Sequence, residues 1–175
     1  MLELLKQRRS IRRFEPRAVE QAKIDILTEA ILRAPSSRGL NPWEFVIVTD
    51  PATLQVLGGA KPHGAEFLAG APLAFVIAAD AERCDVWTED CAIAAIILQL
   101  TATSLGLGSC WAQMRLRPHG DGQTAEAFVR QLVNLPERMH VDCIIGIGYP
   151  GETKPAHPRR SLPFGKIHRE RFGGS

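Results

Sequence analysis

The segment 91–98, CAIAAIIL, constrains the fold more than any other part of the sequence, because it is apolar on every face of the helix that contains it. We predict that helix over 86–105, with Asp85 as a possible N-cap and Gly106 as its C-terminal stop. A helix that is apolar all round must be covered on all sides. The 175 residues suit one domain, so residues 1–175 are taken as a single unit. In so small a protein the second cover could be a partner subunit.

The remaining periodicity predicts an α+β fold, with helices packed on a small sheet. Further helices are expected over 2–9, 20–34, from 51 onward and over 124–133, and strands over 45–48, 73–79, 108–114 and 141–147. Asp50-Pro51 has the capping side chain and first-turn proline of a helix start. The residues after about 150 contain prolines and glycines without periodicity, so this extended tail needs a surface to lie on.

Composition excludes several classes of protein. Hydrophobic residues make up 45% and charged residues 23%, which is typical of a globular protein. A net charge of +2 does not favour a nucleic-acid partner. No apolar stretch is long enough for a membrane span. The five histidines form no HxH or HExxH pattern, so no metal site is expected.

Cysteine usage indicates a reducing compartment. None of the four cysteines forms a CxxC pair, and the first residues do not resemble a signal peptide. We therefore expect a cytoplasmic protein.

Basic residues cluster near the start of the chain, in RRSIRRF over 8–14. Clusters in a near-neutral protein indicate a local anion site. An arginine fork matches phosphate oxygens, and a serine adds a hydroxyl donor. Arg8, Ser10 and Arg12 alternate, so an extended backbone would direct all three the same way. The alternative is a solvated basic helix end.

Three further segments carry candidate site residues. APSSRGLNPWEF over 34–45 has small polar residues that could surround the polar edge of a heterocycle, or it is an ordinary loop with Trp43 as a core anchor. GLGSCWA over 106–112 would let a planar ligand approach the backbone, or it is a helix stop before a buried strand. Cys110 within it is better explained as a structural thiol than as a nucleophile. After IGIGYPG, Lys154, Arg159 and Arg160 could form a second phosphate clamp or a solubilising tail.

Taken together and in this order, the motifs RRSIRRF, APSSRGLNPWEF, GLGSCW and GYP resemble those of the flavin-binding nitroreductase family over nearly the whole chain. The resemblance implies a nitroreductase-like fold, with a central, mostly antiparallel sheet surrounded by helices. It also implies an intertwined homodimer with an FMN in each of two interface sites, and a tail over about 150–175 that packs on the partner subunit.

The same resemblance implies a set of FMN-binding residues. The opening motif would hold the phosphate and ribityl chain, and the Pro-Ser-Ser segment of the partner subunit would lie along the ring. The strand after Gly-Leu-Gly would contact the ring from the other side, and Arg159 or Arg160 would complete the phosphate site, with Lys154 as a competitor. The implied residues are Arg8, Arg9, Ser10, Arg12, Pro35, Ser36, Ser37, Arg38, Asn41, Cys110, Trp111, Arg159 and Arg160.

The implied activity is a two-step cycle in which NADH or NADPH gives hydride to flavin N5, and an electron-poor acceptor such as a nitroaromatic or quinone then takes it. No side chain is required as a catalytic acid, base or nucleophile. Two alternatives remain open. One is a flavin enzyme for another acceptor, namely an enone, free flavin or halogenated aromatic. The other is a non-enzymatic flavin-binding or redox-sensing protein, because 64–70 lacks the lysine found in some members.

Overall fold

A computed structural model describes residues 1–120 and 122–174. The helices are α1 (Leu2–Gln7), α2 (Gln21–Leu32), α3 (Pro51–Gly58), α4 (Trp87–Ser104) and α5 (Ala125–Leu132). The strands are β1 (Trp43–Val48), β2 (Leu73–Asp80), β3 (Gly108–Gln113), β4 (Pro118–Gly120), β5 (Gln123–Thr124) and β6 (Met139–Gly148). Short 3₁₀ turns cover η1 (Ser37–Gly39), η2 (Glu66–Gly70), η3 (Arg159–Ser161) and η4 (Phe164–Lys166).

The four strands predicted from the sequence form one sheet in the order β1-β2-β6-β3. Each neighbouring pair is antiparallel, so the prediction of an antiparallel sheet in an α+β fold is confirmed. The two central strands, β2 and β6, are buried on both faces, which explains why they read as continuous apolar runs.

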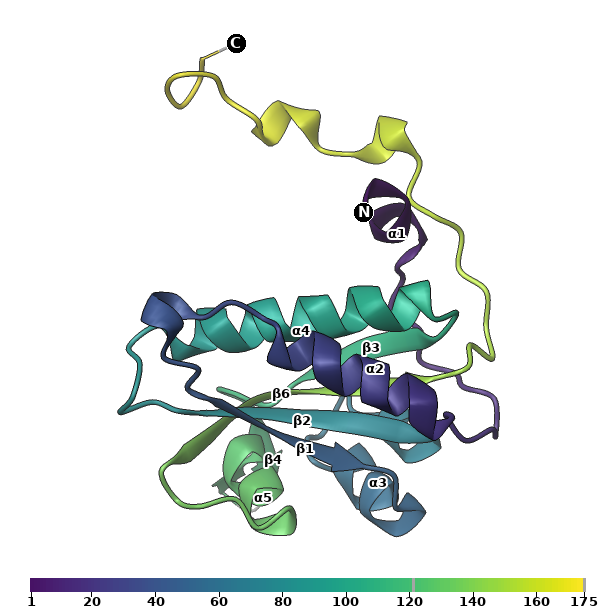
Figure 1. The fold of residues 1–175 in the computed structure, drawn as a ribbon, viewed down its shortest axis with the longest axis vertical. Helices are drawn as coiled ribbons and strands as arrows, with labels where there is room; N and C mark the ends of the chain where they lie inside the picture. Colours follow the sequence, from purple (N-terminus) through teal and green to yellow (C-terminus); the bar gives the residue numbers. More distant parts are fainter. Residues whose placement is uncertain (121, 175) are drawn as a thin grey trace.

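Helices cover both faces of this sheet. Figure 1 shows α2 and α4 on one face and α3 and α5 on the other. Each face has its own core: Leu27, Leu98 and Ile145 belong to the first, and Leu54, Val129 and Ile144 to the second. Neighbouring Ile144 and Ile145 lie in different cores because side chains alternate across a strand.

Side-chain caps explain where α3 and α5 begin, and the predicted cap of α4 is not the observed one. Asp50 accepts the N–H of Thr53 at 2.8 Å and caps α3, as predicted. Thr124 caps α5 in the same way. The prediction of Asp85 as the cap of α4 is wrong, because Val86 occupies the N-cap position. The carboxylate of Asp85 instead pairs with Arg38, 2.6 Å away, so it was a charge partner for a distant loop rather than a local cap.

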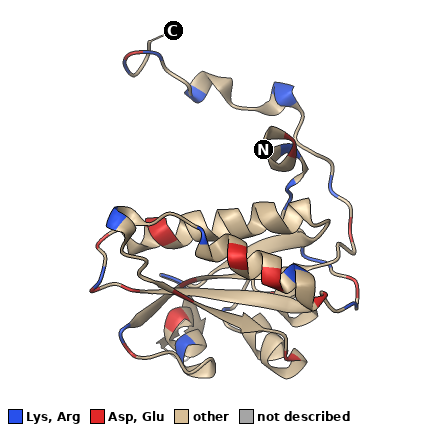
Figure 2. Ribbon diagram, viewed as in Figure 1, with Lys and Arg blue, Asp and Glu red and all other residues tan. Residues whose placement is uncertain are grey.

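The sequence predicts that α4 is covered on all sides, and a single chain covers it only in part. The sheet, α2 and α1 cover much of the helix, but Ile93 and Ile96 each stay 38% exposed. Figure 2 shows no charged residue along the middle of α4. Other large exposed apolar residues lie on α1 and on the tail, for example Leu2 and Phe164. One chain therefore leaves an apolar surface along α4 uncovered.

The tail after residue 154 runs away from the body of the molecule and beyond α1 (Figure 1). Residues 155–173 are all exposed. No helix among residues 1–120 and 122–174 is long and apolar enough to cross a membrane.

Candidate functional site

The basic segment 8–14 lies along the outer edge of β3. Ser10 forms an isolated parallel bridge with Ser109, and the N–H of Ile11 donates to the carbonyl of Ser109 at 3.0 Å. This approach needs a glycine at 108, because a Cβ there would lie 2.8 Å from the Cβ of Ile11. The glycine predicted to allow close backbone approach therefore admits the chain's own N-terminal segment.

The alternation predicted for this segment brings two of its three residues to one place. Ser10 pairs with Ser109, the neighbour of Cys110, and the charge of Arg12 acts on the Cys110 thiol. Arg8 instead reaches α4, where its Nη1 donates to Oε1 of the buried Gln99 at 3.5 Å. Arg9 lines a cavity of about 250 Å³ together with Glu152 and Lys154. Ser10 and Arg12 thus lie toward Cys110, Arg8 lies toward α4, and Arg9 lines a cavity that Lys154 shares.

Residues just after β6 hold the basic segment from the other side. The Nζ of Lys154 donates to the carbonyl of Ser10 at 2.6 Å. Glu152 Oε1 accepts the N–H groups of Arg12 at 2.6 Å and Arg13 at 3.3 Å, and it pairs with Lys154 at 3.1 Å. These backbone N–H groups, followed by Lys154, lower the pKa of Glu152 below its usual value. The cation of Lys154 is thereby fixed next to Ser10.

The structure separates the three basic tail residues that the sequence left as alternatives. Lys154 also influences the Cys110 thiol, so it lies at the same site as Ser10 and Arg12. Arg159 and Arg160 lie in η3 on the exposed tail, where the guanidinium of Arg159 packs over the ring of Phe164 at 4.9 Å. Figure 2 shows the basic residues of the tail away from the body of the molecule. Within one chain, only Lys154 joins the basic segment.

The loop over 35–41 is a rigid structure in which two residues share a small hydrogen-bond ring. Ser36 Oγ donates to Asn41 Oδ1 at 2.7 Å and accepts the N–H of Asn41 at 2.9 Å. Arg38 and Asn41 have φ of 54° and 47°, a left-handed conformation that is uncommon outside glycine. Pro35 precedes this ring in the same loop. Such conformations persist only where surrounding contacts enforce them.

Asp90 on α4 makes the main contact that holds the loop over 35–41 in this conformation. Its side chain is 2% exposed, and its Oδ1 accepts the N–H of Ser37 at 2.8 Å. Its Oδ2 lies 3.4 Å from the thiol of Cys84, which donates to it. The pair between Arg38 and Asp85 ties the loop to the turn before α4. The loop is therefore fixed to the N-terminal end of α4.

One chain does not bring the loop and the basic segment together. The loop contacts α4 at Asp90, and the basic segment contacts it at Gln99. At 1.5 Å per residue, these two positions are about 14 Å apart along the helix. Figure 1 shows the loop at one end of α4 and the N-terminal segment toward the other. One chain thus carries two separate groups of candidate residues, which we call half-sites.

The strand β3 lies beside the basic segment. Cys110 is 1% exposed, and burial raises the pKa of its thiol. A protonated, buried thiol is a poor nucleophile, which supports the structural interpretation of this cysteine. Trp111 is half-buried, and its Nε1 donates to Oε1 of Gln113 at 2.9 Å. Trp111, rather than the thiol, is the partly exposed side chain of β3 that a planar ligand could contact.

Sequence reasoning missed several residues that shape these half-sites. The missed residues are Asp90, Gln99, Gln113, Asp142 and Glu152. Asp90 and Gln99 did carry a signal, because they are polar residues that flank the apolar segment 91–98. The prediction used only the apolar segment between them. Gln113 links Trp111 to the carbonyl of Asp142, whose carboxyl is buried with a raised pKa. Nothing local in the sequence indicated that contact.

The donors at the β3 edge suit a phosphate monoester. Guanidinium, ammonium and hydroxyl groups of Arg12, Lys154 and Ser10 lie at this edge, and the guanidinium of Arg8 lies toward α4. Hydrogen bonds from charged donors to phosphate oxygens are roughly twice as strong as neutral ones. The arrangement binds and orients an anionic ligand, and it offers no activated nucleophile.

Comparisons with known proteins place this geometry in context. The model of the nitroreductase family matches residues 5–61 and 54–149. A protein of Methanothermobacter thermautotrophicus, provisionally named an NADH dehydrogenase/NAD(P)H nitroreductase, is 33% identical over 87% of this chain and 78% of its own length. A protein of Archaeoglobus fulgidus with the same provisional name is 31% identical over 98% of each chain. The solved structure of an FMN-dependent nitroreductase from Clostridium difficile R20291 is 45% identical, with a TM-score of 0.97 over 98% of this chain and 100% of that one.

Proposed function

This chain belongs to the nitroreductase family, and from that membership and its half-sites we propose that it is an FMN-dependent oxidoreductase. It takes hydride from NADH or NADPH and passes it to an electron-poor small molecule, such as a nitroaromatic or a quinone. The observation that carries the proposal is the basic segment held between β3 and Lys154, which places phosphate donors at the edge of the strand that carries Trp111. FMN supplies the hydride chemistry at N5 when it is bound.

The residues at the β3 edge fit the terminal phosphate of FMN. Arg8, Ser10 and Lys154 would hold that phosphate and the ribityl chain. Arg12, next to Cys110, would face the ring, where a cation stabilises negative charge that develops near N1 and O2. The roles of Arg9, Arg159 and Arg160 stay predictions. Arg9 lines a cavity with Lys154, whereas Arg159 and Arg160 lie in η3 on the exposed tail.

The second half-site would act on the FMN of a partner subunit. The N–H groups and hydroxyls of 35–41 suit the polar edge of a flavin ring, and Asp90 holds them rigidly. Because one chain keeps the two half-sites about 14 Å apart along α4, a complete site needs two copies. A homodimer would also cover Ile93 and Ile96 and give the tail a surface. We therefore propose that the protein is an obligate dimer.

The proposal is tested first by the colour of the purified protein. We expect a yellow protein from which heat releases FMN, not FAD, and which NADH or NADPH bleaches in the absence of oxygen. A colourless protein that fails to take up added FMN contradicts the proposal. A yellow protein that neither nucleotide bleaches would instead be a non-enzymatic flavin-binding protein.

The acceptor is tested by turnover with a panel of a nitroaromatic, a quinone, an enone, free flavin and a halogenated aromatic. We expect the nitroaromatic or the quinone to give the highest kcat/KM. Turnover with only the enone, only free flavin or only the halogenated aromatic would show that the same flavin site serves a specialised acceptor.

We also propose that the protein works in the cytoplasm. All four cysteines are free thiols and are buried. Reduced thiols are the rule in that compartment. Fractionation of cells that express the protein at its natural level tests this assignment.

A further inference from the structure

A second basic cluster lies between the loop after α3 and the start of β4. Lys61, Pro62, His63, Arg117 and Pro118 line a cavity of about 300 Å³. None of these residues belongs to the set that would hold FMN. Two segments more than 50 residues apart in sequence form the cavity, so its basic character is a product of the fold.

Side-chain contacts fix these two segments against each other. The Nδ1 of His119 lies 3.0 Å from the carbonyl oxygen of Ala60, the residue before Lys61. The ring of His119 also stacks on Phe128 of α5, with centroids 3.9 Å apart. The hairpin β4–β5 is thereby held to the loop, which places Arg117 beside Lys61.

Lys61 and Arg117 line the same cavity, and the charge of Glu66, whose Oε2 accepts the N–H of Gly64 at 2.7 Å, also acts on Lys61. Within the part of the chain that the structure describes, no salt bridge involves Lys61, His63 or Arg117. Burial, followed by the charge of Arg117, lowers the pKa of Lys61. Two like charges at one site destabilise each other unless an anion lies between them. With two cations and the one carboxylate of Glu66, these groups keep a net positive charge, which suits an anion.

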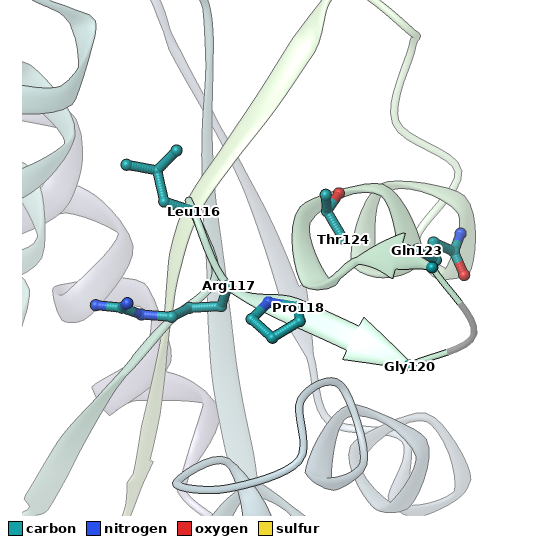
Figure 3. Close-up of a pocket in the computed structure, with 7 residues that line it drawn as sticks. Leu116, Arg117, Pro118, Gly120, Gln123 and Thr124 are labelled. Carbon is teal, nitrogen blue, oxygen red and sulfur yellow. The ribbon is translucent and has the colours of Figure 1, made fainter.

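The turn that presents Arg117 is strained. Leu116 has φ of 59°, an outlier for a residue that is not glycine, and its side chain is 75% exposed. Figure 3 shows the side chain of Arg117 extending away from Gln123 and Thr124, off the hairpin. Strain of this kind is found at ligand sites.

The cluster adjoins the proposed flavin site. Ala60, the residue before Lys61, packs in the same hydrophobic core as Cys110 of β3, the strand beside which Ser10 and Lys154 lie. The phosphate of FMN already has its own donors at the β3 edge. A second phosphate-bearing ligand must approach the same site in the proposed reaction, and that ligand is the pyridine nucleotide.

We propose that Lys61 and Arg117 bind the 2′-phosphate of NADPH, so that this protein uses NADPH in preference to NADH; this rests on the proposed function. A phosphate monoester carries close to two negative charges at neutral pH, which NADH lacks at that position. Arg117 supplies a fork of donors to its oxygens, and Lys61 supplies a point charge. His63 and the two prolines complete the walls of the cavity.

The first experiment measures kcat/KM for NADPH and NADH with the holoenzyme. We expect the wild-type protein to favour NADPH by tenfold or more. Arg117→Ala and Lys61→Ala should each lower kcat/KM for NADPH by roughly tenfold or more, as expected when a hydrogen bond to a charged group is lost. In both variants kcat/KM for NADH should fall by much less. Arg117→Lys should recover part of the preference, and Arg33→Ala, an exposed arginine on the end of α2, is the matched control.

The second experiment measures binding directly, by calorimetry with 2′,5′-ADP and 5′-AMP. We expect the wild-type protein to bind 2′,5′-ADP more tightly, and Arg117→Ala to abolish the difference. This measurement needs no turnover, so it tests the cluster even if the proposed activity fails.

Three results would overturn the proposal. The first is a wild-type protein that uses NADH as well as NADPH. The second is an equal loss with both nucleotides in the Arg117 and Lys61 variants. The third is a weaker FMN affinity in those variants, which would assign the cluster to the flavin site instead. Absence of flavin, or of bleaching by either nucleotide, would refute the proposed function and not the phosphate site.

Discussion

The substitution Arg8→Ala tests the core of the proposed flavin site. In the structure Arg8 makes only a long bond, 3.5 Å from its Nη1 to Oε1 of Gln99. A bond of that length is weak, and a guanidinium has five N–H donors, so most of them are available to a phosphate. A hydrogen bond to a charged group contributes about 1.5–3 kcal/mol. The loss of FMN affinity should therefore be roughly 10- to 150-fold.

The assay titrates flavin-free protein with FMN and with riboflavin, and follows the quenching of flavin fluorescence. Riboflavin has the ring and the ribityl chain but no phosphate. If Arg8 binds the phosphate, the variant should lose the stated affinity for FMN and very little for riboflavin. Added salt should weaken the binding of FMN to the wild-type protein more than to the variant, because salt screens the charge pair.

Two controls separate binding from folding. Arg33→Ala removes an exposed arginine that pairs only with Glu29 on its own helix, so FMN affinity should not change. The free energy of unfolding of flavin-free Arg8→Ala, measured by thermal unfolding, should differ from that of the wild-type protein by about 1 kcal/mol or less. The reason is that the variant loses only the weak bond to Gln99. Equal losses for FMN and riboflavin would show that Arg8 acts through the fold or the dimer. Unchanged FMN affinity would shift the phosphate role to other arginines.

Three further predictions follow from the structure. Ile96→Glu places a charge on the open face of α4, and light scattering should then give a mass near 19.2 kDa with no bound flavin; a dimer that keeps FMN would refute the interface. Asp90→Ala leaves the N–H of Ser37 without its acceptor and should lower the free energy of unfolding by about 1–3 kcal/mol, whereas Asp90→Asn, which keeps an acceptor, should lose less; equal losses would refute the role of this bond. The pKa of Glu20 is lowered to about 2, chiefly by the hydroxyl of Tyr149, so its contribution to stability is present above about pH 4.5 and is lost as the pH falls toward 2. The pH dependence of thermal unfolding between 5 and 2 should therefore be weaker in Tyr149→Phe, and an identical profile would contradict the prediction.

Local patterns in the sequence predicted most of the regular structure. Alternation and apolar runs located the four strands of the sheet, and capping chemistry located the start of α3 at Asp50. The hairpin β4–β5 was missed, because its strands have three and two residues and carry no periodicity. The cap of α4 was assigned wrongly, because an aspartate before a helix has the same local appearance whether it caps or pairs elsewhere.

The sequence by itself determined which chemistry the candidate site holds. Arginines and a serine in RRSIRRF, and small polar residues in APSSRGLNPW, are properties of short segments that need no neighbours to be recognised. The apolar helix segment likewise determined that α4 must be covered, because an apolar surface is driven out of water whatever covers it.

Only the tertiary structure decided which of these groups meet. It placed Lys154, and not Arg159 or Arg160, next to Ser10, and it brought Arg117 beside Lys61. It also fixed the loop over 35–41 to Asp90, far from the basic segment of the same chain. Such pairings depend on how the sheet and helices bury their apolar faces, and that burial is set by contacts between residues distant in sequence. A short segment carries the identity of its side chains, but the packing of the whole chain decides their partners.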